Sequence, residues 1–243
     1  MTKLSNSPLV SYTRITSFKS VPRTASITKI TPHHVGGNAT VEALGQVFAT
    51  PGRNASSNYG IGSDGRIGMY VEEKDRSWCS SSSANDNTAV TMEIANNSGD
   101  PSWTVSDAAW EALIKLCVDI CRRNPGIKQK DGRPGLYCDG TPNASLTFHR
   151  YFAATGCAQP YIWNRRQQLC DEVNKRLGQK DKEEEEMAEP VYKEIEDVPS
   201  WGRPTVEKLV KSGALQGDDS GLNLPYTMLR ILAIHDRMGL YDK

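Results

Sequence analysis

The sequence predicts an α/β protein, with a central mixed β-sheet flanked by helices and a small C-terminal helical domain. Strand-like segments alternate with amphipathic helical segments as far as residue 177, and only helical patterns occur from residue 191 onward. Between them, residues 178–190 form a charge run without apolar periodicity, typical of a solvated helical extension or linker. Strands that alternate with helices are typical of a sheet covered by helices. We therefore predict domains at 1–177 and 191–243, joined by a charged linker at 178–190.

The first predicted strand and helix follow each other near the N-terminus. Residues 27–35 alternate enough to predict a strand that ends in two adjacent histidines. Residues 38–52 predict a short helix, with Asn38 or Thr40 as its N-cap. The two segments open the alternation of strand and helix.

A hairpin, a buried strand and a long helix come next. The dipeptide Asp64-Gly65 suits the tight turn of a hairpin, because both residue types tolerate the backbone that such a turn requires. Residues 88–97 predict a mostly buried strand. Residues 106–124 have the apolar stripe of an amphipathic helix, with Ser106 as N-cap.

The rest of the chain is predicted to be loop and helix. Residues 124–145 are rich in Gly, Pro, Asn and Asp and predict a long loop. Residues 162–178 predict a helix that ends at Gly178. Residues 200–217 and 224–242 predict two further helices.

Composition excludes several classes of partner. The chain has 29 basic and 29 acidic residues, so no net positive charge recruits nucleic acid. No apolar run approaches the ~20 residues that span a bilayer, which excludes membrane insertion. The N-terminus has no continuous apolar segment, so we expect a protein made in the cytoplasm without a signal peptide. Six cysteines in 243 residues indicate buried thiols or metal thiolates rather than a disulfide scaffold.

The chain has four histidines, and two of them, His33 and His34, are adjacent. His149 and Cys157 lie eight residues apart further along, in "HRYFAATGC". A catalytic zinc needs three protein ligands and one open position, and imidazole and thiolate are suitable ligands. Successive side chains of a strand face opposite sides, so only one of the two adjacent histidines can reach such a metal. From spacing alone, an interior His149 and a small buried Cys157 are an equally good interpretation.

Four stretches carry a resemblance to a known family. In order, "ITPHHVGG", "SSNYGIGSDGRI", "VTMEIAN" and "LTFHRYFAATGCAQPYIWNR" resemble the zinc-dependent N-acetylmuramoyl-L-alanine amidases, a superfamily that includes phage endolysins and the peptidoglycan recognition proteins. The resemblance covers about residues 25–177. It implies that Zn²⁺ is bound by His33, His149 and Cys157, and that His34 supports the site or fills the opposite face.

The resemblance also implies the catalytic residues. Glu93, in an otherwise apolar strand, is the expected general base, since a buried carboxylate is costly unless it is paired or functional. The alternative is a Glu93 that forms an ion pair with an arginine. Some relatives use a tyrosine seven residues before the Asp-Gly turn, where this chain has Ser57, and this departure favours Glu93. Thr155, two residues before the cysteine, could steady the oxyanion or could simply stabilise a turn.

The expected substrate is peptidoglycan. Trp78, Asn85 and Asn96 are candidates for lining the substrate groove, because glycans and stem peptides require flat apolar faces and amide donors. The C-terminal segment 191–243 resembles half of an S-layer-homology-type motif, which implies binding to a wall polymer. Self-association and a purely structural role are the alternatives for this segment.

These expectations combine into one functional prediction. The protein is expected to cleave the amide bond between N-acetylmuramic acid and L-alanine by zinc-activated water, as a phage or prophage endolysin that acts on the bacterial cell wall after release from the cytoplasm. Two alternatives stay open: a non-catalytic peptidoglycan-binding module, and a cytosolic amidase that recycles wall fragments. Cys157 argues against the first, and a wall-binding tail would argue against the second.

Overall fold

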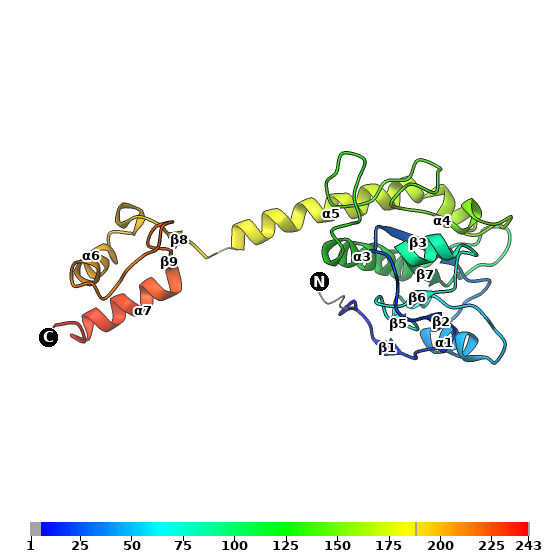
Figure 1. The fold of residues 1–243 in the computed structure, drawn as a ribbon, viewed down its shortest axis with the longest axis horizontal. Helices are drawn as coiled ribbons and strands as arrows, with labels where there is room; N and C mark the ends of the chain where they lie inside the picture. Colours follow the sequence, from blue (N-terminus) through cyan, green and yellow to red (C-terminus); the bar gives the residue numbers. More distant parts are fainter. Residues whose placement is uncertain (1–5, 188, 243) are drawn as a thin grey trace. The chain divides into compact units, whose positions relative to one another are not determined.

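A five-stranded mixed sheet lies at the centre of the first part of the chain in the computed structural model, which describes residues 6–187 and 189–242 (Figure 1). From one edge to the other, its strands are β1 (Tyr12–Thr13), β5 (Ile67–Met69), β4 (Tyr59–Ile61), β7 (Ala89–Ile94) and β3 (Lys29–His34). The pairs β1–β5, β4–β7 and β7–β3 are parallel, and β4–β5 is antiparallel. The predicted mixed sheet is confirmed.

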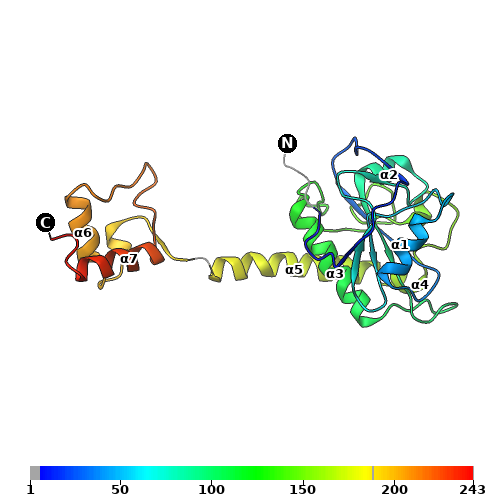
Figure 2. The ribbon, with the colours of Figure 1, turned by 90° about the horizontal axis from the view of Figure 1, so that it is seen from below.

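Helices cover both faces of this sheet (Figure 2). They are α1 (Val41–Ala49), α2 (Ser83–Thr88), α3 (Asp107–Arg123), α4 (Pro160–Asn164) and α5 (Arg166–Met187), with the 3₁₀ helix η1 (His149–Tyr151). Two short strands, β2 (Lys19–Ser20) and β6 (Arg76–Ser77), pair separately. The predicted α/β class with flanking helices is therefore also confirmed.

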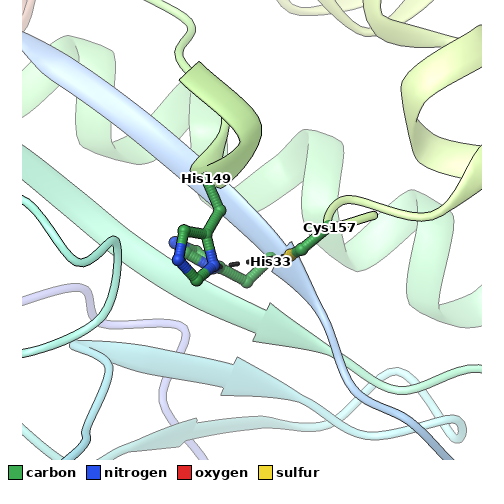
Figure 3. A group of neighbouring side chains, drawn as sticks. All are labelled: His33, His149 and Cys157. Carbon is green, nitrogen blue, oxygen red and sulfur yellow. Dashed lines mark hydrogen bonds between the residues drawn. The ribbon is translucent and has the colours of Figure 1, made fainter. Parts of the chain in front are cut away.

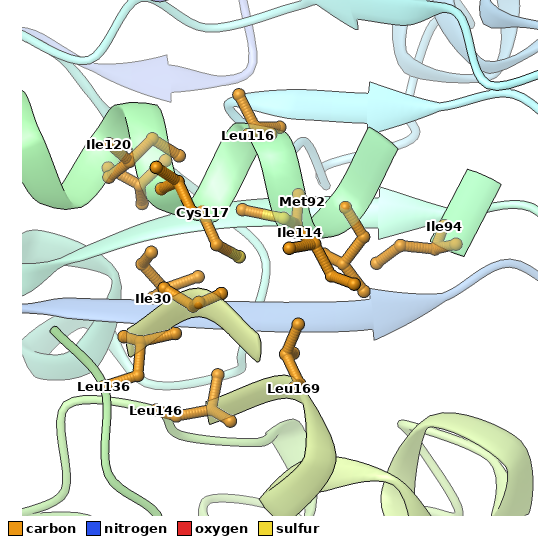
Figure 4. Packing of buried hydrophobic residues seen from close by; sticks show 14 of the residues in the cluster. Ile30, Met92, Ile94, Ile114, Leu116, Cys117, Ile120, Leu136, Leu146 and Leu169 are labelled. Carbon is orange, nitrogen blue, oxygen red and sulfur yellow. The ribbon is translucent and has the colours of Figure 1, made fainter. Parts of the chain in front are cut away.

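The larger core lies between the sheet, α3 and α5 (Figure 4). Ile30 of β3 and Met92 of β7 pack there with Cys117 of α3. Cys117 and Cys121 are buried among aliphatic side chains, as expected for core residues. Full burial of an aliphatic side chain such as Ile30 or Met92 contributes about 1.5–3 kcal/mol to stability.

The opposite face of the sheet carries α1. Tyr59 and Ile61 of β4 point into the larger core, so Gly60 between them faces α1. A Cβ at Gly60 would lie 2.8 Å from Leu44 Cδ1 and 2.7 Å from the Tyr70 ring. The missing side chain thus lets Leu44 and Tyr70 approach the strand.

Several local predictions can be compared directly. Thr40 and Ser106 cap α1 and α3, each accepting a hydrogen bond from a backbone N–H three residues on. The hairpin turn contains Gly65 with a φ of +84°, the left-handed backbone that glycine adopts without strain. The predicted helix end at Gly178 is wrong, because α5 continues to Met187.

The second part of the chain is described by itself. Contacts divide the chain at Lys180, inside α5, into Met1–Lys180 and Asp181–Lys243. The elements of the second unit are β8 (Val191–Tyr192), η2 (Ile195–Asp197), α6 (Arg203–Lys211), β9 (Leu224–Pro225) and α7 (Tyr226–Arg237). The two predicted helices are present, the β8–β9 pair was not predicted, and the roles assigned to 1–177, 178–190 and 191–243 remain predictions. Within 6–187 and 189–242, no helix is both long and apolar enough to cross a membrane.

Candidate metal and catalytic site

Three side chains from distant parts of the chain meet at one point of the first unit (Figure 3). One ligand atom from each of His33, His149 and Cys157 lies within 4.8 Å of the others. The His33 and His149 rings have centroids 5.0 Å apart. The structure therefore brings together the three residues that the sequence singled out.

The position of His149 follows from a segment that runs beside β3. The Ile30 N–H donates to the Ser145 carbonyl at 2.8 Å, and the Thr147 N–H donates to the Ile30 carbonyl at 3.0 Å. This pairing carries the chain along β3 towards its C-terminal end, where His33 lies. His149 begins η1 two residues after Thr147, next to the His33 ring.

Cys157 lies in the loop between η1 and α4, and Arg150 holds this loop. Arg150 Nε donates to the Cys157 carbonyl at 3.2 Å, and its Nη2 donates to the Gly156 carbonyl at 2.6 Å. The guanidinium also stacks over the Trp163 ring at 4.2 Å. These contacts place Cys157 Sγ 3.6 Å from His33 Nδ1.

This spacing fits a tetrahedral metal site. With Zn–N of about 2.0 Å and Zn–S of about 2.3 Å, two ligands at the tetrahedral angle lie roughly 3.5 Å apart. The observed separation of His33 Nδ1 and Cys157 Sγ matches that value. Two imidazoles and one thiol leave the fourth position for water, as in catalytic zinc sites.

The protonation states of the donors also suit a metal. Burial, together with the neighbouring His149, lowers the pKa of His33 to about 3. Burial likewise lowers the pKa of His149. Both imidazoles are therefore neutral at pH 7 and have a lone pair to offer. Burial and the nearby Glu93 raise the pKa of Cys157 to about 12, so its thiol must lose a proton when a cation binds.

His34 is not one of the three donors, although it lines the cavity onto which they open. It is buried, and its ring meets the edge of Trp103 with centroids 5.6 Å apart. Neither ring nitrogen has a hydrogen-bond partner among the described residues. Burial lowers its pKa to about 4, so it packs as a neutral ring.

Glu93 lies beside the cluster on the neighbouring strand. In the parallel β3–β7 pair it is in register with His33, so both side chains project to the same face. Burial raises the pKa of Glu93 to about 7, although Arg53 partly opposes the shift. Within the described residues, no ion pair joins Glu93 to a basic side chain. This carboxylate thus titrates near neutral pH beside the three donors.

A cavity of about 530 Å³ opens onto these residues. His33, Glu93, His149, Cys157 and Trp78 all line it. Trp78 is held at its edge by a hydrogen bond from Nε1 to Ser20 Oγ at 3.0 Å.

Asn85 and Asn96 do not line this cavity. Asn85 is buried, where its amide donates to Thr31 Oγ1 at 3.1 Å and accepts from Thr147 Oγ1 at 3.2 Å. It therefore ties α2 to β3 and to the segment before His149. Asn96 donates to the Val35 carbonyl at 2.6 Å and so holds the chain just after β3.

Thr155 also lies outside the cavity lining. Its hydroxyl accepts a hydrogen bond from the Cys157 backbone N–H at 3.3 Å. The contact shapes the turn that presents the cysteine. The side chain is exposed, so its hydroxyl is also accessible from solvent.

Three further residues of the site had no signal in the sequence. Ser81 Oγ lies 3.0 Å from His149 Nε2 and orients that ring. Cys79 lines the cavity, and its sulfur forms a second close group with His33 and Glu93, all within 4.8 Å. Arg53 lines the cavity near Glu93. Neither spacing nor periodicity distinguishes these residues from the surrounding loop residues.

Comparisons with known proteins concern the family and the fold. A family model described as N-acetylmuramoyl-L-alanine amidase matches residues 23–160, more than half of the chain. The fold is similar to that of a selenomethionine derivative of AmpD, with a TM-score of 0.51 and 16% identity over 70% of this chain and 98% of that chain. It is also similar to PlyL, with a TM-score of 0.50 and 12% identity over 67% of this chain and 95% of that chain.

A third similar structure is the endolysin LysCS from Clostridium intestinale, with a TM-score of 0.47 and 15% identity over 71% of this chain and 99% of that one. No curated protein matches this chain in sequence.

Proposed function

Because the chain belongs to the N-acetylmuramoyl-L-alanine amidase family, we propose that it is a zinc-dependent hydrolase of peptidoglycan. It cleaves the amide between the lactyl group of N-acetylmuramic acid and L-alanine. The observation that carries this proposal is the convergence of His33, His149 and Cys157, with Glu93 beside them. A binding module without catalysis has no need of this donor set.

Different residues of the chain bind the metal and transfer the proton during hydrolysis. When bound by His33, His149 and Cys157, zinc lowers the pKa of a water and polarises the scissile carbonyl. The Glu93 carboxylate takes a proton from the attacking water and returns it to the leaving nitrogen of L-alanine. A pKa near neutrality suits both transfers, since the same group must accept and then release the proton.

Positioning residues keep this arrangement in place. Ser81 fixes the His149 ring, and Arg150 fixes the loop that carries Cys157. The Thr155 hydroxyl donates a hydrogen bond to the developing oxyanion once substrate is bound. The Trp78 ring offers a flat face for a sugar ring. Asn85 and Asn96 act by holding the walls of the site rather than by touching substrate.

The biological role of the protein depends on whether its substrate is intact cell wall or small wall fragments. We assign the protein to the phage or prophage endolysins, which attack intact wall from the cytoplasmic side. The resemblance of the N-terminal unit to the amidases that include phage endolysins supports this assignment. The second unit supplies a surface for binding a wall polymer. A recycling amidase would act instead on small soluble fragments.

The test uses purified full-length protein and intact sacculi. Newly exposed L-alanine amino groups are measured with and without a zinc chelator, and again after zinc is restored. The proposal predicts release that chelator abolishes and zinc restores. Cys157→Ser should lose both metal and activity, whereas Glu93→Gln should keep metal and lose turnover. A zinc-free protein that releases no amino groups under any condition contradicts the proposal.

A second substrate separates wall lysis from recycling. The same assay on soluble muramyl peptides gives a second rate. An endolysin should act on sacculi at least as efficiently, per cleavable bond, as on these fragments. Activity confined to the fragments would favour the recycling amidase.

A further inference from the structure

The second unit has a pocket of its own, of about 370 Å³, between α7 and the turn before α6. Its lining combines two aromatic rings with two guanidinium groups and a small aliphatic floor. The lining residues are Trp201, Tyr226, Arg230, Ala233, Ile234 and Arg237.

The sequence of α7 builds one wall of this pocket. Tyr226, Arg230, Ala233 and Arg237 recur at spacings of four, three and four, which places them on one face of a helix. Ala233 is buried and is the smallest of them, so it leaves a hollow between the longer side chains.

A close approach of backbone and helix builds the other wall. A Cβ at Gly202 would lie 2.8 Å from Leu229 Cδ1, so a larger residue in this turn would force the Leu229 side chain of α7 to shift. The approach brings Trp201 next to Tyr226, with ring centroids 6.0 Å apart and planes at 89°. Trp201 remains 41% exposed. The two rings thus form an open corner.

The charge of the pocket is unbalanced. Arg230 lies over the Tyr226 ring at 5.9 Å. Within residues 189–242, neither Arg230 nor Arg237 forms an ion pair or donates a hydrogen bond. Asp236, next to Arg237 in sequence, instead accepts hydrogen bonds from Thr205 and Lys208. Two guanidinium groups therefore face an aromatic corner with no carboxylate beside them.

We propose that this pocket binds the glycan strand that the amidase leaves behind, through the free lactyl carboxylate of its muramic acid. The proposal rests on the proposed function, which supplies the carboxylate. Hydrolysis adds one water across the amide, so the lactyl group leaves as a carboxylate and L-alanine leaves as an amine. The intact bond has no charge at that position, whereas its product does.

The chemistry of the pocket matches an acidic sugar. An indole or phenol ring offers a flat apolar surface to the C–H face of a pyranose. A guanidinium binds a carboxylate through two parallel hydrogen bonds, a geometry that a lysine cannot supply. The aromatic faces and the guanidinium groups together select a sugar ring that bears a carboxylate. Such binding keeps the enzyme on strands that it has already cut, beside bonds that it has not.

The experiment measures binding of the full chain in a Glu93→Gln background, which prevents hydrolysis of the methylamide sample described below. The probe is peptide-free glycan strands, prepared from sacculi with a separate amidase and titrated by calorimetry. A second sample of strands has its lactyl carboxylates converted to methylamides. We expect the amidated strands to bind about tenfold more weakly or worse.

Variants locate the binding to the pocket. Arg230→Gln combined with Arg237→Gln, and separately Trp201→Leu, should each weaken binding about tenfold or more. The matched control removes two exposed lysines away from the pocket, Lys193→Gln combined with Lys211→Gln, and should bind as the parent does. Because the altered arginines are exposed, the thermal midpoint should change little, which a melting curve checks.

Each other outcome overturns the proposal. Equal binding of free and amidated strands removes the role of the carboxylate. Unchanged binding in the arginine variant removes the role of the pocket. Tighter binding of a wall phosphate polymer than of the strands makes the pocket a phosphate site. A change of mass in light scattering for the arginine variant makes it a self-association surface.

Failure of the proposed function has a different signature. In that case the parent protein releases no L-alanine amino groups, although the pocket variants still alter strand binding. Release without pocket-dependent binding overturns only the inference about the pocket.

Discussion

Glu93 of β7 stands in register with His33 of β3, on the same face of two parallel strands. Adjacent strands lie about 4.8 Å apart, so the pairing holds a carboxylate beside an imidazole without any loop. His149 of η1 and Cys157 of the following loop add two further donors beside this pair. The placement of the proposed base is thus a property of the sheet.

The first prediction concerns Glu93 as a catalytic base. Glu93→Gln should lower kcat by roughly 10²–10⁴-fold, the usual contribution of general acid–base catalysis, with little change in bound zinc. The parent protein should show an acid limb in kcat with a midpoint at or below pH 7, because bound zinc lowers the pKa of the carboxyl from about 7. A variant that retains both its rate and its acid limb would exclude Glu93 as the base.

Glu93 should also affect stability in the metal-free protein. Its pKa in the folded state is about 7, above the ordinary value of 4.5, so the folded state binds the proton more tightly than the unfolded state. The free energy of unfolding therefore falls as pH rises from about 4.5 to 7. Glu93→Gln removes this loss, so the variant should gain up to about 3 kcal/mol relative to the parent at pH 8 and nothing at pH 4. Urea unfolding at both pH values measures the difference.

In the Glu93→Gln variant, which lacks the carboxyl that titrates near pH 7 in the parent, metal binding at pH 6 should release one proton. Both histidines are neutral at pH 7, since burial lowers their pKa values, whereas burial keeps the Cys157 thiol protonated. Affinity for zinc in this variant should therefore rise about tenfold per pH unit between pH 6 and 7, where zinc-bound water still keeps most of its protons, and Cys157 supplies the proton. Calorimetry in two buffers of different ionisation enthalpy counts the protons. A count near zero, or near two, would show that other ligands titrate.

Arg150 should control metal affinity without touching the metal. It holds the Cys157 loop through two backbone carbonyls. Arg150→Gln should weaken zinc binding about 10–100-fold, the usual effect of losing a group that orients a ligand. Arg165→Gln is the matched control, because Arg165 stacks on Tyr161 at 3.8 Å and makes no contact with this loop. Equal zinc affinity of the Arg150→Gln and Arg165→Gln variants would mean that the loop keeps its conformation without Arg150.

Asn85 should prove structural. Its amide joins Thr31, Ser80 and Thr147 in a buried network beneath His149. Asn85→Ala removes three hydrogen bonds from this buried network, although Thr31 and Thr147 still bond each other at 2.8 Å, and should cost about 1–3 kcal/mol of unfolding free energy. Ser83→Ala, an exposed change on the same helix, should stay within about 0.5 kcal/mol. A normal stability with a raised KM would instead restore Asn85 as a substrate contact.

The sequence indicated the elements of the site better than its supporting residues. Strong signals marked β3, α3 and the hairpin, because each depends on local periodicity or on turn chemistry. The approach of His149 to His33 depends on backbone pairing between Ile30 and residues 145–147, which has no periodic signature. Ser81 and Cys79 reach the site from an irregular loop, so only three-dimensional packing identifies them.

Gly178 shows how a strong local signal can fail, and it yields the last prediction. Glycine commonly ends helices in a left-handed conformation, but here α5 passes through it to Met187. The residues that follow, rich in Glu, Lys and Gln, are good helix formers and outweigh a penalty of about 1 kcal/mol for one glycine. A Cβ at Gly178 would meet nothing within 4 Å. Gly178→Ala should therefore raise the helical signal in circular dichroism and stabilise the protein by about 0.5–1 kcal/mol; a loss of helix would restore Gly178 as a helix end.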